Sequence, residues 1–392
     1  MDADILIVGA GCAGLSLAVH LLEAGASDLQ ILLVDRREVH VRDRTWCYWS
    51  GLDHPFQAAV RQSWHRWRIV TSEGEVERRS RSVAYQCVPA DAFYDLALER
   101  IEQSRNVKLR RGVSVEAFSD VAGGVAALTK DGRITARQAF DSRPHRDAPI
   151  PSGEIHWLQH FVGLEVETEQ AVFDPSVATL MDFRVMDGDD IRFMYVLPLD
   201  ERTALVEDTF FGGEVRPEGE YVESIGRYLG ERYGVDGWRE LHRERGAIPM
   251  STVPLERPAT DRVTDIGVRA GLARPATGYA FLAIQRHSRR LAVFAVRAGV
   301  DRPMPRGRPY PRATEFLDRV FLSYLAREPA AAPEMFRRMF EGVTPERMAR
   351  FMFDGGSRSD RVALMRSLPA SPLVGQTLRS LRPIMRDSMR RA

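Results

Sequence analysis

The residue types and spacing that most clearly indicate chemistry lie in the first 36 positions, where Gly9, Gly11 and Gly14 precede Asp35. The first glycine of such a triplet permits a tight turn, and the second lets the backbone approach a pyrophosphate at the positive end of a helix. The third lets that helix pack closely on a strand. An acid about 20 residues later is placed to accept hydrogen bonds from a ribose. The set predicts a dinucleotide site and leaves FAD and NAD both open.

The elements that must position these residues can be read on either side of the triplet. Residues 5–8 form a continuous apolar run, which is typical of a strand buried on both faces. Leu15, Ala18, Leu21 and Leu22 recur at helical spacing, and a second apolar run ends at Asp35. The sequence therefore predicts a strand–helix–strand unit around the glycines.

Composition sets the class of protein. A chain of 392 residues with 44% hydrophobic and 28% charged residues is expected to fold into two or three domains. It has no run of about 18 apolar residues, so no bilayer-spanning helix is expected, and no signal-peptide pattern opens it. Cys12, Cys47 and Cys87 are too few and scattered for a disulfide framework or a metal site, so we expect free thiols in a reducing compartment.

The net charge of +1 is unevenly distributed. From Asp301 onward the sequence has 18 arginines and 10 acids. This surplus could meet anionic lipid headgroups or form a solvated helical face, and the sequence leaves both readings open. We expect no nucleic-acid partner.

The rest of the chain alternates between strand-like and helical segments. Strand-like runs fall between residues 64 and 88 and between 107 and 140, with an amphipathic helix at 90–103 between them. Four more strand-like runs fall between 156 and 211, and a helix is expected at 221–234. A strand at 266–271 then leads into a second turn, 274–279, followed by a long helix, and the chain is helical from Pro311.

This order resembles the α/β FAD-binding fold of the glutathione-reductase and hydroxybenzoate-hydroxylase type, which favours FAD over NAD. The resemblance implies a discontinuous Rossmann-like FAD-binding domain, an inserted antiparallel β-sheet substrate domain and a C-terminal helical region. We assign residues 1–60, 90–150 and 260–305 to the first, 61–89 and 151–259 to the second, and 306–392 to the third.

Six local motifs occur in a characteristic order. They are DRTWCYW at 43–49, MDFR at 181–184, YVLP at 195–198, LVEDT at 205–209, RGAIPM at 245–250 and RPATGY at 274–279. Through them the chain resembles the bacterial flavin-dependent lycopene β-cyclases of carotenoid biosynthesis. The likeness extends from residue 1 to about 300.

The resemblance implies an activity, a cofactor and partners. It implies cyclisation of the linear ends of lycopene to β-ionone rings, through γ-carotene to β-carotene, with no net redox change. The enzyme would bind FAD in its reduced form, with NADPH as electron donor. It would take lycopene and γ-carotene from the membrane, on the inner face of the bacterial cytoplasmic membrane.

The resemblance also implies site residues. Glu207 matches the family's catalytic acid, and Asp208 stands where plant relatives carry a second glutamate. Besides Gly9, Gly11, Gly14 and Asp35, the expected cofactor contacts are Arg44, Arg274, Pro275, Thr277, Gly278 and Tyr279.

The reaction chemistry places a demand on Glu207. Protonating an alkene at neutral pH requires a carboxyl whose pKa is raised by nearly three units, and burial beside an apolar substrate supplies that. On a strand, Glu207 shares a face with Leu205 and Thr209 while Asp208 points the other way. We therefore expect Glu207 to be the acid and Asp208 to orient it or to serve the fold.

Several aromatic and C-terminal residues allow two interpretations. Five aromatic side chains either stabilise cations or simply pack in the core: Trp46, Tyr48, Trp49, Phe183 and Tyr279. The Phe/Met/Arg-rich segments 335–340 and 350–353 suit either a membrane-facing surface or a helical lid.

Rival functions on the same fold are a flavin monooxygenase, an isoprenoid reductase and a non-catalytic polyisoprenoid-binding protein.

Overall fold

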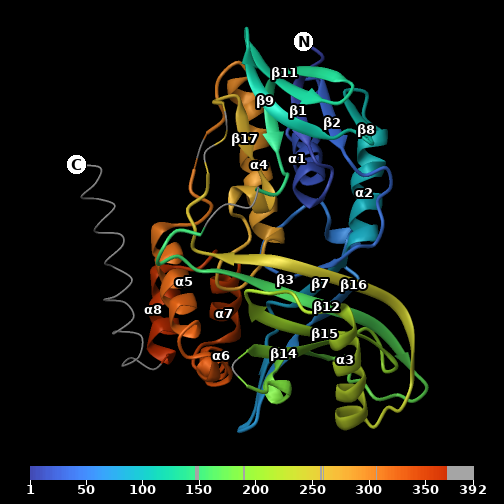
Figure 1. Ribbon diagram of the computed structural model, residues 1–392, viewed down its shortest axis with the longest axis vertical. Helices are drawn as coiled ribbons and strands as arrows, with labels where there is room; N and C mark the ends of the chain where they lie inside the picture. Colours follow the sequence, from blue (N-terminus) through green and yellow to red (C-terminus); the bar gives the residue numbers. More distant parts are fainter. Residues whose placement is uncertain (146–149, 189, 257, 259, 306, 369–392) are drawn as a thin grey trace.

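The computed structural model describes residues 1–145, 150–188, 190–256, 258, 260–305 and 307–368. A mixed seven-stranded sheet forms its upper part in Figure 1. Its parallel strands are β8 (Val107–Arg111), β2 (Ile31–Asp35), β1 (Ala3–Val8), β11 (Gly132–Asp141) and β17 (Val263–Asp265). The strands β10 (Gly124–Thr129) and β9 (Val115–Val121) extend it antiparallel from β11. The apolar run in β1 is buried, as a strand covered on both faces requires.

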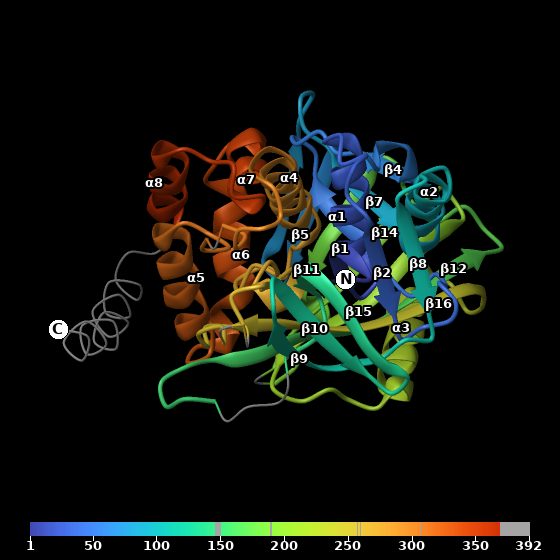
Figure 2. The same ribbon diagram turned by 90° about the horizontal axis from the view of Figure 1, so that it is seen from above.

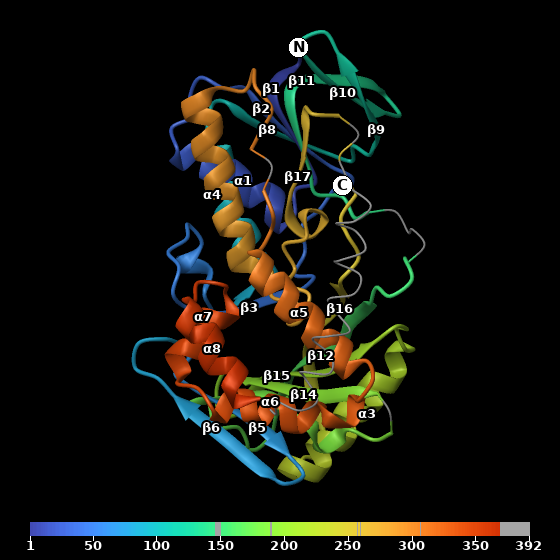
Figure 3. The same cartoon turned by 90° about the vertical axis from the view of Figure 1, so that its left-hand side faces the viewer.

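Two helices that lie far apart in the sequence pack side by side next to the first sheet. Helix α1 (Cys12–Glu23) follows the glycine turn, and α4 (Phe281–Ala298) packs against it (Figure 3). Helix α2 (Ala90–Glu102) contacts the other side of α1. The three helices share one apolar core with β1 and β2. The predicted βαβ unit is therefore present, with the late helix packed beside its first helix.

A second seven-stranded sheet lies below the first in Figure 1. Its order is β16 (Trp238–Ser251), β12 (His156–Thr168), β15 (Thr203–Gly212), β14 (Ile191–Pro198), β13 (Val177–Asp182), β5 (Arg66–Thr71) and β6 (Gly74–Arg79). All neighbours pair antiparallel except β13 and β5, which are parallel. This is the predicted inserted sheet, with one parallel pair that the sequence did not indicate.

The two faces of this sheet carry different layers. Alternate side chains such as Val206 and Met194 pack against α3 (Glu218–Tyr233). Their neighbours Leu205 and Phe193 face a core shared with the C-terminal helices. These helices are α5 (Arg312–Leu325), α6 (Ala332–Glu341), α7 (Pro345–Met352) and α8 (Arg358–Ser367), gathered on one side of the molecule (Figure 2).

A small sheet joins the two parts of the chain. Strand β7 (Tyr85–Pro89) lies between β3 (Thr45–Trp49) and β4 (Gln62–Trp64), antiparallel to both. It combines residues that the predicted domain bounds separate, because β3 belongs to the range 1–60 and the other two strands to 61–89.

Two details of the predicted elements were wrong. The strand expected at 266–271 ends at Asp265, and Gly267–Ala270 form a 3-10 turn. Gly267 has φ +66°, and a Cβ there would lie 2.7 Å from that of Ala13, so the glycine lets this turn approach α1 closely. Strand β16 was not predicted, because residues 238–245 are mostly charged and show no clear alternation of apolar and polar positions.

The C-terminal helices bury the side chains that suggested a membrane-facing surface. Met335, Phe336, Met339 and Phe340 are at most 4% exposed and pack toward the sheet. The arginines between them, Arg337 and Arg338, pair with Glu334. These segments are therefore a helical cover over the core. No helix of the described residues combines the length and the apolar character needed to cross a bilayer.

One buried ion pair ties this cover to the turn before α4. Arg274 is 1% exposed and donates from Nη2 and Nε to Asp318 of α5 at 2.9 and 3.0 Å. Its Nη1 also donates to the carbonyl of Phe351 in α7, and the guanidinium lies 4.2 Å from the centroid of the Phe351 ring. Arg274 thus joins three segments in the interior.

We expect Arg274→Ala to lower the free energy of unfolding by about 3–5 kcal/mol, because it leaves the Asp318 carboxylate buried without its partner. Urea unfolding measures the loss, and Arg297→Ala, an exposed change on α4, is the matched control. Equal stabilities of the two variants would contradict the structural role of Arg274.

Candidate active site

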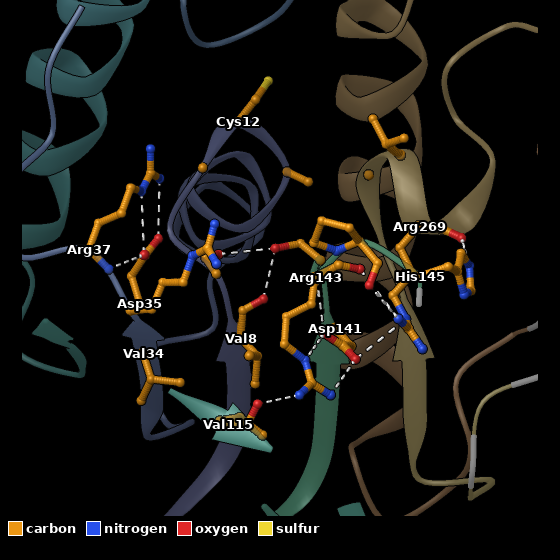
Figure 4. A pocket seen from close by; sticks show the side chains of 18 of the residues that line it. Val8, Cys12, Val34, Asp35, Arg37, Val115, Asp141, Arg143, His145 and Arg269 are labelled. Atoms are coloured by element: carbon orange, nitrogen blue, oxygen red, sulfur yellow. Dashed lines mark hydrogen bonds and ion pairs between the residues drawn. The ribbon is translucent and has the colours of Figure 1, made fainter. Parts of the chain in front are cut away.

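A cleft of about 990 Å³ opens where the parallel strands of the first sheet end (Figure 4). Gly9 and Gly11 line it at the start of α1, Asp35 at the end of β2, and Arg44 just before β3. Ala280 and Ile284 line it at the start of α4. The cleft therefore extends between the N-terminal ends of two helices, both of which attract negative charge.

The three glycines have different surroundings. A Cβ on Gly9, where φ is +94°, would lie 2.1 Å from Ser142 Oγ, and one on Gly14 would lie 1.8 Å from the Gly9 carbonyl oxygen. A Cβ on Gly11 would meet nothing closer than an Arg37 nitrogen at 3.6 Å. Gly9 thus allows the Ser142 side chain to approach closely, Gly14 allows close backbone packing, and Gly11 leaves the cleft open for a bound group.

Asp35 lies at the predicted place with both oxygens in use. It accepts from the backbone N–H of Ala10 at 2.6 Å and of Arg37 at 2.7 Å, and the Arg37 guanidinium lies 3.2 Å away. Burial alone would raise the pKa of Asp35, but these hydrogen bonds and the guanidinium hold it below its usual value. A ribose hydroxyl could replace Arg37 here and leave the backbone bonds intact.

The predicted turn 274–279 lies next to the cleft, and none of its side chains is among the lining residues. The side chain of Arg274 is bound to Asp318, which corrects the expectation that it contacts a cofactor. A Cβ on Gly278, where φ is +70°, would lie 2.6 Å from Gln159 Oε1. The turn therefore sits against β12, and the half-buried Pro275 belongs to it.

Two buried oxygens near this turn have no hydrogen-bond partner among the described residues: Thr277 Oγ1 and Gln159 Oε1. Buried polar atoms normally have hydrogen-bond partners. Two oxygens without partners beside the start of α4 therefore fit a site for a further bound group.

Glu207 lies on β15 in the second sheet, with Tyr195 of β14 and Gly163 of β12 directly beside it. Thr209 Oγ1 donates to Glu207 Oε1 at 2.8 Å. The residue keeps some accessible surface, and protein atoms surround its carboxyl group.

This environment changes the protonation of Glu207. Burial raises its pKa to about 8, the nearby Glu244 and Asp208 carboxyls add to the rise, and the hydrogen bond from Thr209 opposes it. Glu207 is therefore mostly protonated at pH 7, as a proton donor must be.

Asp208 has different contacts on the opposite face. It is fully buried and receives two hydrogen bonds from Arg192, at 2.8 and 3.0 Å, beneath α3. The prediction of opposite faces for the two acids is confirmed by these contacts. Of the two roles expected for Asp208, orienting Glu207 or serving the fold, these contacts favour the second, because its oxygens are bound on the far side of the sheet.

A single strand separates the cleft from Glu207. In β3, Trp46 lines the cleft, and the next residue, Cys47, packs in the core on the Glu207 side, close enough for the two groups to interact electrostatically. Consecutive strand residues point to opposite faces, so β3 brings a cofactor cleft and a buried acid together.

The aromatic candidates divide between core and site. Tyr48, Trp49 and Phe183 are at most 3% exposed and pack in the core; Tyr48 stacks on Phe281. Trp46 is half-buried at the cleft. Tyr279 is half-buried, with its hydroxyl 3.3 Å from that of Tyr85, which also bonds to Tyr195. Only Trp46 and Tyr279 therefore remain candidates for contact with bound molecules.

Sequence reasoning missed Glu244 on β16. It is 3% exposed and accepts a hydrogen bond from Thr45 Oγ1 at 2.7 Å. Its strand was itself not predicted, and the neighbouring motif at 245–250 was the only indication that this segment matters.

We expect Glu207→Gln to have a higher free energy of unfolding relative to the wild type at alkaline pH than at acid pH. Between about pH 4.5 and 8 the folded wild type keeps a proton on Glu207 that the unfolded chain has lost, so its free energy of unfolding falls as the pH rises through this window. The variant lacks this contribution.

Urea unfolding at about pH 5 and about pH 9 measures the change, with the half-buried Glu167→Gln of β12 as control. A stability difference from wild type that is the same at both pH values would contradict the raised pKa of Glu207.

Comparisons with known proteins agree with the fold and the motifs. A family model described as "Lycopene cyclase protein" matches residues 4–377. A lycopene beta-cyclase from Paracoccus sp. is 26% identical, covering 99% of this chain and all of its own.

Two solved structures share the fold. A geranylgeranyl bacteriochlorophyll reductase-like protein from Thermoplasma acidophilum has a TM-score of 0.59 at 12% identity, covering 95% of this chain and 98% of its own. The flavin-dependent monooxygenase PieE, solved with FAD and substrate, has a TM-score of 0.58 at 15% identity, covering 96% of this chain and 73% of its own. The match of the family model over nearly the whole length shows that the chain belongs to the lycopene cyclase family.

Proposed function

We propose that this protein is a lycopene β-cyclase that converts the linear ends of lycopene to β-ionone rings without net redox change. The observation that carries the proposal is Glu207, a buried carboxyl that keeps its proton near neutral pH in a chain of the lycopene cyclase family. Acid catalysis of cyclisation requires such a group, whereas oxygenation or hydride delivery does not.

We propose FAD as the cofactor, because the cleft and its residues fit a dinucleotide. Gly9 and Gly11 would face the pyrophosphate, Asp35 the ribose, and Arg44 lies on the cleft wall. The start of α4, where Ala280 and Ile284 line the cleft, would meet the other end. When bound and reduced, with NADPH as the proposed electron donor, the flavin supplies negative charge next to a cationic intermediate.

The protein's own part in the reaction centres on Glu207. It would give its proton to C2 of the terminal C1–C2 double bond, and the C5–C6 double bond would then attack the tertiary cation at C1. Loss of the proton at C6 completes the β ring. Thr209 is placed to donate to the carboxylate that Glu207 becomes, and the buried surroundings exclude water that would quench the cation.

We propose that the substrate enters from a membrane surface on the inner face of the cytoplasmic membrane, since lycopene and γ-carotene dissolve in lipid. Helix α4 supports this. It contains no acid, and Arg286, Arg289 and Arg290 line a hollow of about 320 Å³. Asp53 also lines the hollow, so the three arginines outnumber the acid there, and this face suits anionic headgroups.

Glu207→Gln is expected to abolish ring formation, because the amide removes the acid and keeps its shape. Expression in a lycopene-accumulating bacterium with pigment analysis measures this, and purified protein should keep its flavin absorbance. The same change in β12, Glu167→Gln, is the control. β-Carotene from the Glu207→Gln strain would contradict the acid role, and oxygen uptake by the wild type would favour a monooxygenase.

Reversing two charges on α4, Arg289→Glu with Arg290→Glu, should reduce co-sedimentation with anionic phospholipid vesicles several-fold, since each basic residue contributes about 1 kcal/mol near such a surface. Arg105→Glu with Lys108→Glu makes the same charge change at exposed positions on and before β8. Equal vesicle binding by the two double variants would exclude α4 as the docking face.

A further inference from the structure

Three strands of the second sheet bring two carboxyls together. Gly163 of β12 pairs with Glu207 of β15 on one side and with Glu244 of β16 on the other. Residues directly opposite one another in a sheet project from the same face. The two glutamates therefore share a face, one strand apart on each side of a glycine.

Gly163 leaves the space between them open. A Cβ at this position would lie 3.2 Å from Glu244 Cγ and 3.6 Å from Glu207 Cγ, and also 3.2 Å from a methyl carbon of Leu205. Any side chain here would separate the two carboxyls. With glycine, the carboxyls face each other across bare backbone.

The pair also differs from the other buried acids of this sheet. Glu165 binds Arg42 and Arg61, Asp182 binds Arg184, and Asp208 binds Arg192. Within the described residues, Glu207 and Glu244 each receive a side-chain hydrogen bond only from a threonine, Thr209 and Thr45 respectively. Two carboxylates this close, with no arginine hydrogen-bonded to either, cannot both ionise readily.

The groups around the pair decide which carboxyl ionises first. Those facing Glu207 are Tyr195, Tyr279 and Cys47, and those near Glu244 are Arg42, Arg44, Cys47 and Cys87. Burial raises the pKa of each of these tyrosines and cysteines, so they stay neutral, and burial lowers the pKa of His242 on β16. Burial raises the pKa of Glu244 as well, whereas the nearby Arg42 and Arg44 favour its ionised form. The charged neighbour of Glu207 is Asp208, which further disfavours ionisation of Glu207.

We propose that Glu244 is a positioning residue of the active site, whose charge across Gly163 keeps the proton on Glu207. This inference rests on the proposed role of Glu207 as the acid. Glu244 then needs no contact with the substrate, because it acts through the carboxyl beside it. The two groups titrate as a coupled pair, with Glu244 losing its proton first.

The test is the pH dependence of cyclisation by purified enzyme with lycopene in vesicles. Wild-type activity should fall above about pH 8, as Glu207 loses its proton. In Glu244→Gln this alkaline limb should move toward lower pH by about one unit, because the repelling charge is gone. Glu244→Asp keeps the charge and should restore the wild-type limb, and Glu240→Gln, an exposed change on the same strand, should not move it.

A second measurement does not depend on turnover. Infrared difference titration follows the protonated carboxyl band of Glu207, assigned by its loss in Glu207→Gln, and that band should disappear at lower pH in Glu244→Gln. Gly163→Ala should shift it in the same direction by separating the pair, and serves if Glu244→Gln fails to fold.

The outcomes separate the two claims. A lower rate in Glu244→Gln with an unchanged alkaline limb and an unchanged carboxyl band would overturn the proposal and leave Glu244 a structural residue. Ring formation by Glu207→Gln would instead refute the acid role on which the proposal rests.

Discussion

The candidate active site depends on one carboxyl group, that of Glu207, which is buried with no arginine bound to it. Most buried acids of the second sheet are paired with arginine. In Glu165 and Asp182 this pairing holds the pKa below its usual value, and such an acid is no proton donor at neutral pH. Glu207 is not paired with an arginine, because it lies on a strand face covered by tyrosines, a cysteine and a second glutamate. Keeping an acid neutral in this way costs stability, and the large apolar core shared with the C-terminal helices offsets that cost.

The two halves of the candidate site come from different layers of the molecule. The cleft belongs to the parallel sheet and collects two helix N-termini, whereas Glu207 belongs to the antiparallel sheet. The small sheet of β3, β7 and β4 connects them, and the turn before α4 is fixed from behind by the Arg274–Asp318 pair. The C-terminal helices therefore contribute to the site indirectly, by fixing the turn that precedes α4.

Local patterns predicted what depends on local physics. The glycine triplet, the buried runs and the alternation around Glu207 each express a single element, and the structure has those elements at those positions. The partners of Arg274 and Asp208 lie far along the chain or across a strand, so the sequence could not show that both are occupied by ion pairs. The Phe and Met residues of α6 looked equally suited to lipid and to core, and only packing decides between these. Glu244 was missed because the many charged residues of the edge strand β16 obscure the alternation of apolar and polar positions that marks a strand. The same charges protect this edge from pairing with other chains.

The arrangement of β3 has a consequence for how this region of the chain can change. This strand alone lies between the two parts of the site. The Trp46 side chain points to the cleft, and the Cys47 side chain points to the side where Glu207 lies. Inserting or deleting one residue between Arg44 and Trp49 would exchange the two sides and put the indole into the space around the acid. Substitutions can therefore adjust either compartment independently, but the length of this segment is fixed by geometry.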